Sequence, residues 1–145
     1  MRSFDLPNGG RVTVERMISF GQEGEQVTEN DSANNQIGVS WCPEQTYDAM
    51  ANLFRKLRNA VVSGNQEAVA DVMGFPVDLN NGGKIVAIRN RAEFNRRYDE
   101  MLTPAVIKHF AQASPQAVLC RGDGVGFANG TVWARNWKTI DVVNQ

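Results

Sequence analysis

The residue types that most often carry metal or redox chemistry are scarce in this chain, which has two cysteines, Cys42 and Cys120, and one histidine, His109. No C-x-x-C pair is present, so the spacing predicts neither a zinc site nor a thioredoxin-type redox centre. A single histidine cannot complete an H-E-x-x-H motif or a facial triad. We therefore expect no metal and no cofactor. The sequence leaves open whether the cysteines pair, and we favour two free, largely buried thiols.

Candidates for acid–base chemistry lie in the second half of the chain. Tyr98 and Asp99 are adjacent, and Tyr98 shares a predicted helix face with Phe94 and Met101, where an apolar wall would tune its hydroxyl. The simpler interpretation, which we favour, is a core tyrosine beside a solvated acid. His109 lies late in a short predicted helix, and the favourable contact of a histidine with a helix C-terminus explains it better than a role as a base.

A second group of candidates belongs to the predicted C-terminal strands and their turns. Arg121, Asp123 and Asp141 are the charged members, and Arg121-Gly122-Asp123 spells an adhesion tripeptide to which we give no weight, because three-letter matches are common. Trp133 would line either a ligand cavity or an interface, since tryptophan is enriched where partners meet.

Length and composition are typical of one folded domain: 145 residues, 42% hydrophobic and 21% charged. Lysine and arginine total 15 against 16 acidic residues, so we expect no nucleic-acid partner. No apolar run reaches the roughly 18 residues of a membrane helix, so we expect no membrane association. The N-terminus lacks the apolar stretch of a signal peptide, which favours a cytoplasmic protein, or a periplasmic one if a leader is missing.

The elements that must position these residues begin with a β extension over residues 1–41. Alternating apolar residues around a Pro-Asn-Gly-Gly turn predict a hairpin over 4–20. The residues expected on one face of its second strand are Val12, Val14, Ile18 and Phe20. Residues 21–35 are polar and acidic without periodicity, so we expect a long mobile loop, followed by a short strand over 37–41.

Residues 42–145 show alternating helical and β patterns. Apolar residues at helical spacing predict a long helix over 43–63, and Asn65, Asn90 and Thr103 are typical caps of three further helices. We expect helices over 66–73, from 91, and over 103–110, strands over 75–79 and 84–88, and β segments over 117–121, 125–135 and 138–143.

Several stretches of this region resemble one known superfamily. They are Ala60 to Asn65, Phe75-Pro76-Val77, Arg91 to Phe94, Tyr98-Asp99, Thr103 to Val106, Gly124-Val125-Gly126, Gly130 to Trp133 and Ile140 to Asn144. The chain is similar here to the nuclear-transport-factor-two-like (cystatin-like) superfamily, and to an uncharacterised bacterial branch of it. The resemblance implies an α+β fold in which a curved antiparallel sheet wraps around a long N-terminal helix as a cone or α+β barrel. Residues 42–145 would form this core, and 1–41 would add an N-terminal β hairpin to the same single domain.

The resemblance also implies a pocket between the long helix and the concave sheet. The pocket candidates are Tyr98, Asp99, His109, Arg121, Asp123 and Trp133. Because such folds carry many functions, we keep three hypotheses. The favoured one is a non-catalytic binding protein, a homodimer through its sheet, with a small apolar ligand or a protein partner. The alternatives are a cofactor-free isomerase, dehydratase or hydrolase acting in the pocket, and a protein inhibitor or immunity-type partner that uses the acidic loop 21–35.

Overall fold

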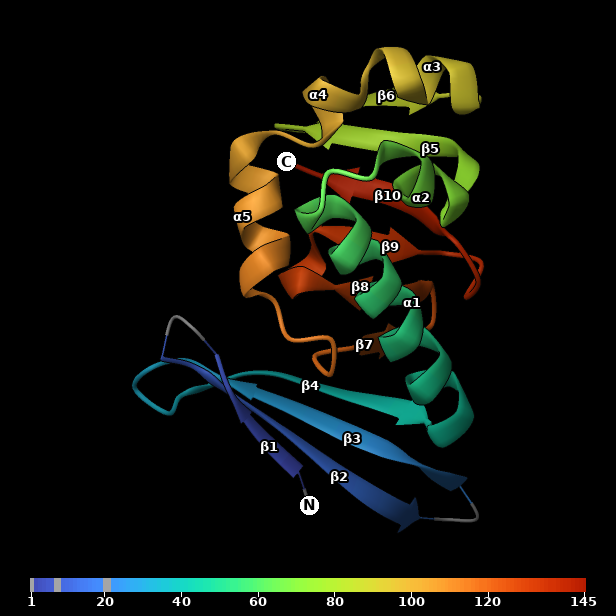
Figure 1. The fold of residues 1–145 in the computed structure, drawn as a ribbon. Helices are drawn as coiled ribbons and strands as arrows, with labels where there is room; N and C mark the ends of the chain where they lie inside the picture. Colours follow the sequence, from blue (N-terminus) through green and yellow to red (C-terminus); the bar gives the residue numbers. More distant parts are fainter. Residues whose placement is uncertain (1, 7–8, 20–21) are drawn as a thin grey trace.

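The computed structural model describes residues 2–6, 9–19 and 22–145, which form an α+β fold with two sheets (Figure 1). The first sheet is antiparallel, in the order β1-β2-β3-β4. The second has six strands, in the order β6-β5-β10-β9-β8-β7. The strands are β1 (Arg2–Asp5), β2 (Arg11–Ser19), β3 (Gln22–Asn30), β4 (Gln36–Pro43), β5 (Met73–Asn81), β6 (Lys84–Ile88), β7 (Leu119–Arg121), β8 (Gly124–Phe127), β9 (Val132–Ala134) and β10 (Ile140–Asn144).

The predicted N-terminal hairpin is confirmed as β1 and β2, with Val12 and Val14 buried; Phe20 lies outside the described residues. The predicted loop over 21–35 is wrong, because residues 22–30 form β3 and pair with β2 from end to end. Only residues 31–35 form the connection to β4. The alternation in β3 was hidden because its inward face carries Glu25 and Glu29 on either side of Val27. The extension is therefore a four-stranded sheet rather than a hairpin.

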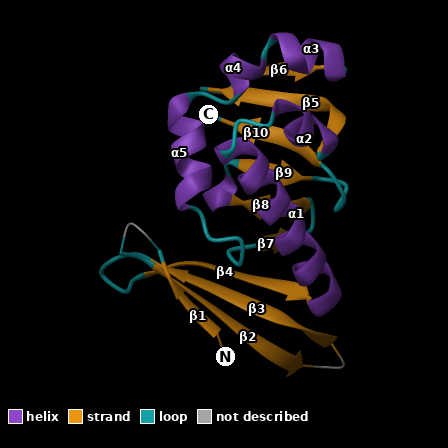
Figure 2. Cartoon of the chain, viewed as in Figure 1, coloured by secondary structure: helices purple, strands orange, loops and turns teal. Residues whose placement is uncertain are grey.

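The helices begin where the caps predict (Figure 2): α1 (Glu44–Val62), α2 (Gln66–Asp71), α3 (Arg91–Arg96), α4 (Tyr98–Met101) and α5 (Pro104–Gln112). The first two end earlier than expected, the helix expected from 91 is divided into α3 and α4, and α5 continues two residues beyond 110. The side chains of Asn65, Asn90 and Thr103 each accept a hydrogen bond from the amide three residues later, at 3.2, 2.9 and 3.3 Å. These bonds satisfy donors that the first helical turn leaves free. No helix in the described part of the chain is long and apolar enough to cross a bilayer.

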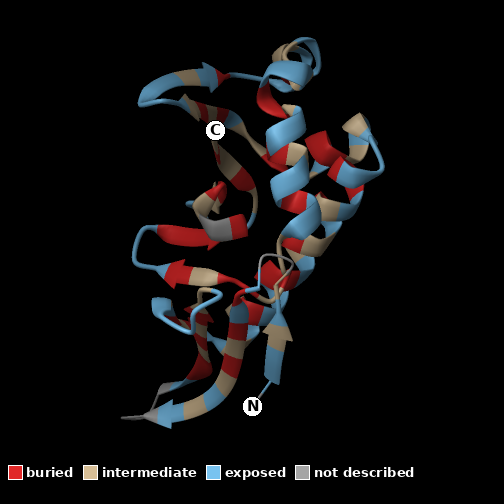
Figure 3. Cartoon of the chain, turned by 90° about the vertical axis from the view of Figure 1, so that its left-hand side faces the viewer, coloured by how far each residue is buried: buried red, intermediate tan, exposed pale blue. Residues whose placement is uncertain are grey.

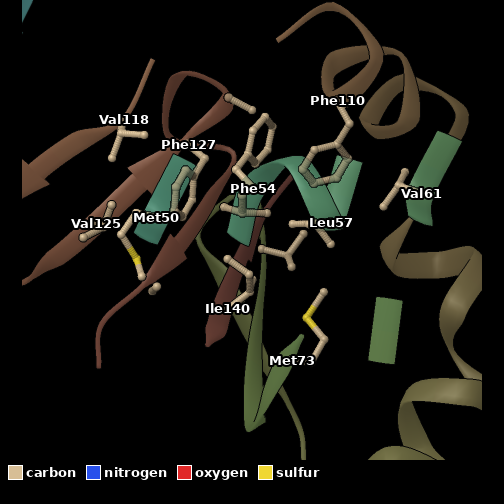
Figure 4. Packing of buried hydrophobic residues seen from close by; sticks show 14 of the residues in the cluster. Met50, Phe54, Leu57, Val61, Met73, Phe110, Val118, Val125, Phe127 and Ile140 are labelled. Carbon is tan, nitrogen blue, oxygen red and sulfur yellow. The ribbon is translucent and has the colours of Figure 1, made fainter. Parts of the chain in front are cut away.

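The core lies between α1, α5 and one face of the curved six-stranded sheet (Figure 3). The ring of Phe54 on α1 stacks on Phe127 of β8 with centroids 5.3 Å apart, and lies 5.8 Å from that of Phe110 on α5 (Figure 4). Leu57 and Ile140 are fully buried in the same layer. Close-packed side chains therefore fill the space in which the resemblance placed a pocket.

Two parts of the expected architecture need correction. The long helix is not N-terminal, because α1 begins at Glu44, after the four strands of the first sheet. The six-stranded sheet is mixed rather than antiparallel, because β10 runs parallel to β5 and antiparallel to β9. Strand β10 enters between two strands made at very different points of the chain, and residue patterns along the sequence do not record such a pairing.

The two sheets meet at their edge strands, β4 and β7. A disulfide joins Cys42 on β4 to Cys120 on β7, so the expectation of two free thiols is wrong. The Ser40 hydroxyl donates to the carbonyl of Val118 at 3.1 Å beside it. The cysteines are 78 residues apart, and only the tertiary fold brings them together. Covalent and hydrogen-bonded contacts therefore fix the four-stranded sheet to the rest of the molecule.

Candidate functional site

A pocket of about 250 Å³ lies between the four-stranded sheet and the C-terminal end of α5. Figure 1 shows the elements that surround it on the left, where the turn from β3 to β4 lies below α5. Its lining residues are Leu6, Glu29, Asn30, Asp31, Ser32, Ile37, His109, Gln112, Ala113, Ser114, Ala117 and Ala128. The four-stranded sheet, α5, the connection from α5 to β7 and the turn at Ala128 contribute to it, so the pocket depends on how the four-stranded sheet sits against the rest of the molecule.

Glu29 is the unusual residue of this pocket. It belongs to the inward face of β3, opposite Val12 of β2, and only 8% of it is exposed. Its carboxyl makes no hydrogen bond or ion pair with any described residue. Four positions earlier on the same face, Glu25 is equally buried but accepts a hydrogen bond from the Arg2 guanidinium at 3.1 Å. Burial without a partner raises the pKa of Glu29.

The space beside the Glu29 carboxyl is open. Its neighbour in register on β4 is Gly38, and a Cβ atom placed there would meet no atom within 4 Å. The ladder shifts by one residue between Glu29 and Asn30, so Ile37 has no cross-strand partner and lines the pocket. This bulge places an apolar side chain next to a buried acid.

His109 contributes a ring nitrogen from α5. The Thr131 hydroxyl donates its proton to the carbonyl of Ala128 at 2.7 Å, so it can only accept from His109 Nδ1, which is 3.2 Å away. This arrangement places the proton of a neutral His109 on Nδ1 and leaves a lone pair on Nε2. His109 therefore lies in the last turn of α5, as the sequence predicts, and also lines the pocket.

The charges around the pocket are negative. Asp31 accepts hydrogen bonds from the amides of Asn35 and Ala33, both at 2.9 Å. The hydrogen bond from the Asn35 amide has the largest effect on the pKa of Asp31, and together these bonds lower that pKa and keep the carboxyl ionised. Among the described residues, the lining contains two acids, Glu29 and Asp31, and neither lysine nor arginine. Together with the apolar side chains of Leu6, Ile37 and Ala117, this favours a cation that carries an apolar body.

The other predicted residues lie away from this pocket. Tyr98 and Asp99 belong to α4, where the Tyr98 ring packs edge-on against Phe94 with centroids 5.7 Å apart. The Tyr98 hydroxyl is buried without a hydrogen-bond partner among the described residues, and Asp99 is exposed. The simpler interpretation of this pair, a core tyrosine beside a solvated acid, agrees with these positions.

The C-terminal candidates lie at the outer side of the six-stranded sheet. Arg121 and Asp123 are exposed around the turn from β7 to β8, and the Arg121 guanidinium lies 5.7 Å from the centroid of the Trp133 ring. Asp141 accepts from the Arg135 guanidinium at 3.0 Å. Of the residues predicted for the site, the structure places only His109 on the pocket. The premise of the inhibitor hypothesis, an acidic loop over 21–35, is replaced by a paired strand.

Sequence reasoning missed Glu29, the residue that distinguishes the pocket. Its signal was the period-two spacing of Glu25, Val27 and Glu29, which places two acids on the same strand face as a valine. Among residues 2–6, 9–19 and 22–145, no three histidine, cysteine, aspartate or glutamate side chains gather to hold a metal ion. Comparison of the chain with protein-family models, with curated proteins and with solved structures gives no match.

Proposed function

We propose that the chain is a non-catalytic binding protein, and that its small ligand occupies the pocket between β3, β4 and α5 with an ammonium group against Glu29. The observation that carries this proposal is a glutamate that is only 8% exposed and whose carboxyl lines the pocket with no partner among the described residues. A buried carboxylate without a partner costs free energy, and a ligand cation recovers it. The apolar part of the ligand would contact Leu6, Ile37 and Ala117.

The same pocket supports the enzyme hypothesis as a second candidate. Glu29 of β3 and His109 of α5 line the same pocket from different elements, and burial raises the pKa of Glu29, which favours a role as a general acid or base. In this case the pair would move a proton on a bound substrate without a cofactor, as an isomerase, dehydratase or hydrolase does. Binding is favoured because it needs only the unpaired carboxyl and the space beside it.

The test uses hexylammonium as a cationic probe, with hexanol and hexanoate as the neutral and anionic probes of similar size. We expect calorimetry to show that hexylammonium binds, and that Glu29→Gln weakens binding by about tenfold or more, as for a hydrogen bond to a charged group. Glu15→Gln removes one charge from the outer face of the same sheet and is the matched control. Equal binding of the three probes, or equal losses in both variants, contradicts the proposal.

We further propose the superfamily membership and self-association that the sequence suggests. The packing of α1 against the curved six-stranded sheet supports the first. For the second, Leu119, Gly126, Trp133 and Val142 are successive partners across β7, β8, β9 and β10. This row alternates with the one that contacts α1, so it faces outward, where no described helix covers the sheet. An outward row with a tryptophan is a surface suited to a second copy.

The disulfide bears on the compartment. Buried disulfides persist in oxidising surroundings and are rare in the bacterial cytoplasm. The Cys42–Cys120 bond therefore supports the periplasmic expectation over the cytoplasmic one, and we propose an oxidising compartment. Thiol labelling of the protein in intact cells before and after reduction tests it, and labelling of both cysteines without a reductant would contradict it.

A further inference from the structure

A second hollow, unrelated to the Glu29 pocket, runs along the exposed side of α1. It has a volume of about 670 Å³, and one wall is a stripe of the helix that includes Leu53, Arg55 and Lys56. The other wall is the connection between β9 and β10, which contributes Trp137 and Lys138. We call these residues, with Asn52 and Asn59, the α1 groove.

The α1 groove is positively charged. Arg55, Lys56 and Lys138 line it, and none of its lining residues is acidic. The ion pairs of the described residues involve a separate set of cations: Arg2, Arg11, Arg16, Arg91, Arg97 and Arg135. The Arg55 guanidinium is held by the Asn52 side-chain oxygen at 2.9 Å, which leaves its other donors available. The chain has a net charge of −1, so this concentration of free positive charge is local.

The aromatic wall of the groove is rigidly held. Trp137 has a φ of 64°, a left-handed conformation that costs a side-chain-bearing residue free energy. The connection is fixed around it, because the Asn136 side chain accepts from the amides of Lys138 and Thr139 at 3.0 and 2.9 Å. The Trp137 amide donates to the carbonyl of Ala134 at 3.2 Å. The backbone of this connection thus holds the half-buried Trp137 and Lys138 across the groove from Arg55 and Lys56 of α1.

We propose that the α1 groove binds an aromatic phosphate of the mononucleotide class. The flat ring would lie against Trp137 and Leu53, since an indole offers a π-face to any planar base. The phosphate would be bound by Arg55, Lys56 and Lys138, whose donors match its oxygens. The volume of the groove accommodates a molecule of this size. Because its described lining has three basic residues and no acid, the groove favours an anion over a cation.

The experiment titrates the full chain with adenosine monophosphate at low ionic strength, and with adenosine and inorganic phosphate separately. We expect the monophosphate to bind more tightly than either part, because ring and phosphate contact different residues. The chain has four lysines, two in the groove and two elsewhere, which provides a matched pair of variants. Lys56→Ala with Lys138→Ala should weaken monophosphate binding by about tenfold or more, as expected from the loss of two charge-assisted contacts. Lys84→Ala with Lys108→Ala should leave it unchanged.

Three outcomes overturn the proposal: no binding of adenosine monophosphate by the unmodified chain, equal losses in the two lysine variants, or binding of phosphate as tight as that of the monophosphate. Trp137→Leu checks the aromatic wall independently, and we expect it to weaken the monophosphate and leave phosphate unchanged. Glu29→Gln should have no effect on these titrations, so this test and that of the Glu29 pocket fail or succeed separately.

Discussion

The two tyrosines of the chain are in opposite hydrogen-bonding situations. The Tyr47 hydroxyl donates to the carbonyl of Gln116 at 3.1 Å, whereas the Tyr98 hydroxyl is buried with no partner. An unpaired buried hydroxyl costs about 1 kcal/mol or more, and a made hydrogen bond contributes about 1 kcal/mol. We therefore expect Tyr98→Phe to raise the free energy of unfolding by about 1 kcal/mol, and Tyr47→Phe to lower it by about 1 kcal/mol. Urea unfolding of both variants measures this, and effects of the same sign would contradict the assignment.

Glu29 makes the stability of the free protein depend on pH. Its pKa is raised in the folded state above the ordinary value of 4.5, so the folded state takes up the proton first as the pH falls. The cost of burying the charge is complete above the raised pKa and disappears as the pH falls from that value toward 4.5. Stability should therefore rise through this window on acidification.

Glu29→Gln removes the charge and should remove this pH dependence. We expect the variant to be more stable than the unmodified protein at neutral pH, because it avoids the cost of burying the charge. Urea unfolding at a series of pH values from acidic to neutral is the measurement. Glu15→Gln serves as the control. A stability curve that is the same for the variant and the unmodified protein would mean that Glu29 is solvated.

Among the elements, those fixed by local chemistry were predicted well. The caps at Asn65, Asn90 and Thr103 act within one turn, so the residue types alone identify the starts of three helices. The face of α1 was also predictable, because Tyr47 and Phe54 recur at the helical period and both are buried. The signals for a helix lie within a few residues of one another, so these elements could be predicted from the sequence alone.

Strand β3 was missed for a physical reason. Glutamates normally mark an exposed face, but Glu25 and Glu29 occupy the buried one, the first neutralised by Arg2 and the second unpaired beside a pocket. The sequence pattern of residues 22–30 therefore predicted a polar loop rather than a strand. Because β3 was not predicted, Glu29 was not recognised as a site residue. An acid on the buried face of a strand can be identified only when the strands that pair with it are known.

The contact between β4 and β7 depends on a covalent bond. The Cys42–Cys120 disulfide closes a loop of 78 residues, and the chain-entropy relation gives about 4.5 kcal/mol for a loop of this length. We expect Cys42→Ala with Cys120→Ala to lower the free energy of unfolding by about that amount. Urea unfolding in the absence of reductant measures it. Full reduction of the unmodified protein, checked by thiol labelling, should reproduce the loss, and unchanged stability after reduction would contradict the prediction.

For the whole molecule, self-association through the outer face of the six-stranded sheet predicts a particle of twice the protomer mass. Ile85 on β6 pairs with Asn80 on that face and is 64% exposed. Because a charged side chain there would be buried without a partner, Ile85→Arg should shift the mass to that of the protomer. Val62→Arg, at an apolar residue of α1 that is 56% exposed, is the control.

Light scattering over a range of protein concentrations distinguishes the outcomes of this substitution. A protomer mass for the unmodified chain at every concentration would contradict the self-association, and dissociation by both arginine variants would place the contact elsewhere. The arrangement of the whole molecule was the part least open to sequence reasoning. The pairing of β10 with β5 and the disulfide each join residues more than 60 positions apart. The Glu29 pocket likewise brings β3 and α5 together.

The central place of β10 also determines when the protein can finish folding. During synthesis, β5 with β6 and β7 with β8 and β9 are made as separate halves, because the strand that lies between them comes last. The two halves cannot join before residues 140–144 leave the ribosome. Until then each half presents an unpaired strand edge to other chains. A ribosome that stalls shortly before residue 140 would therefore release a polypeptide that contains most of the core residues and yet is prone to aggregate.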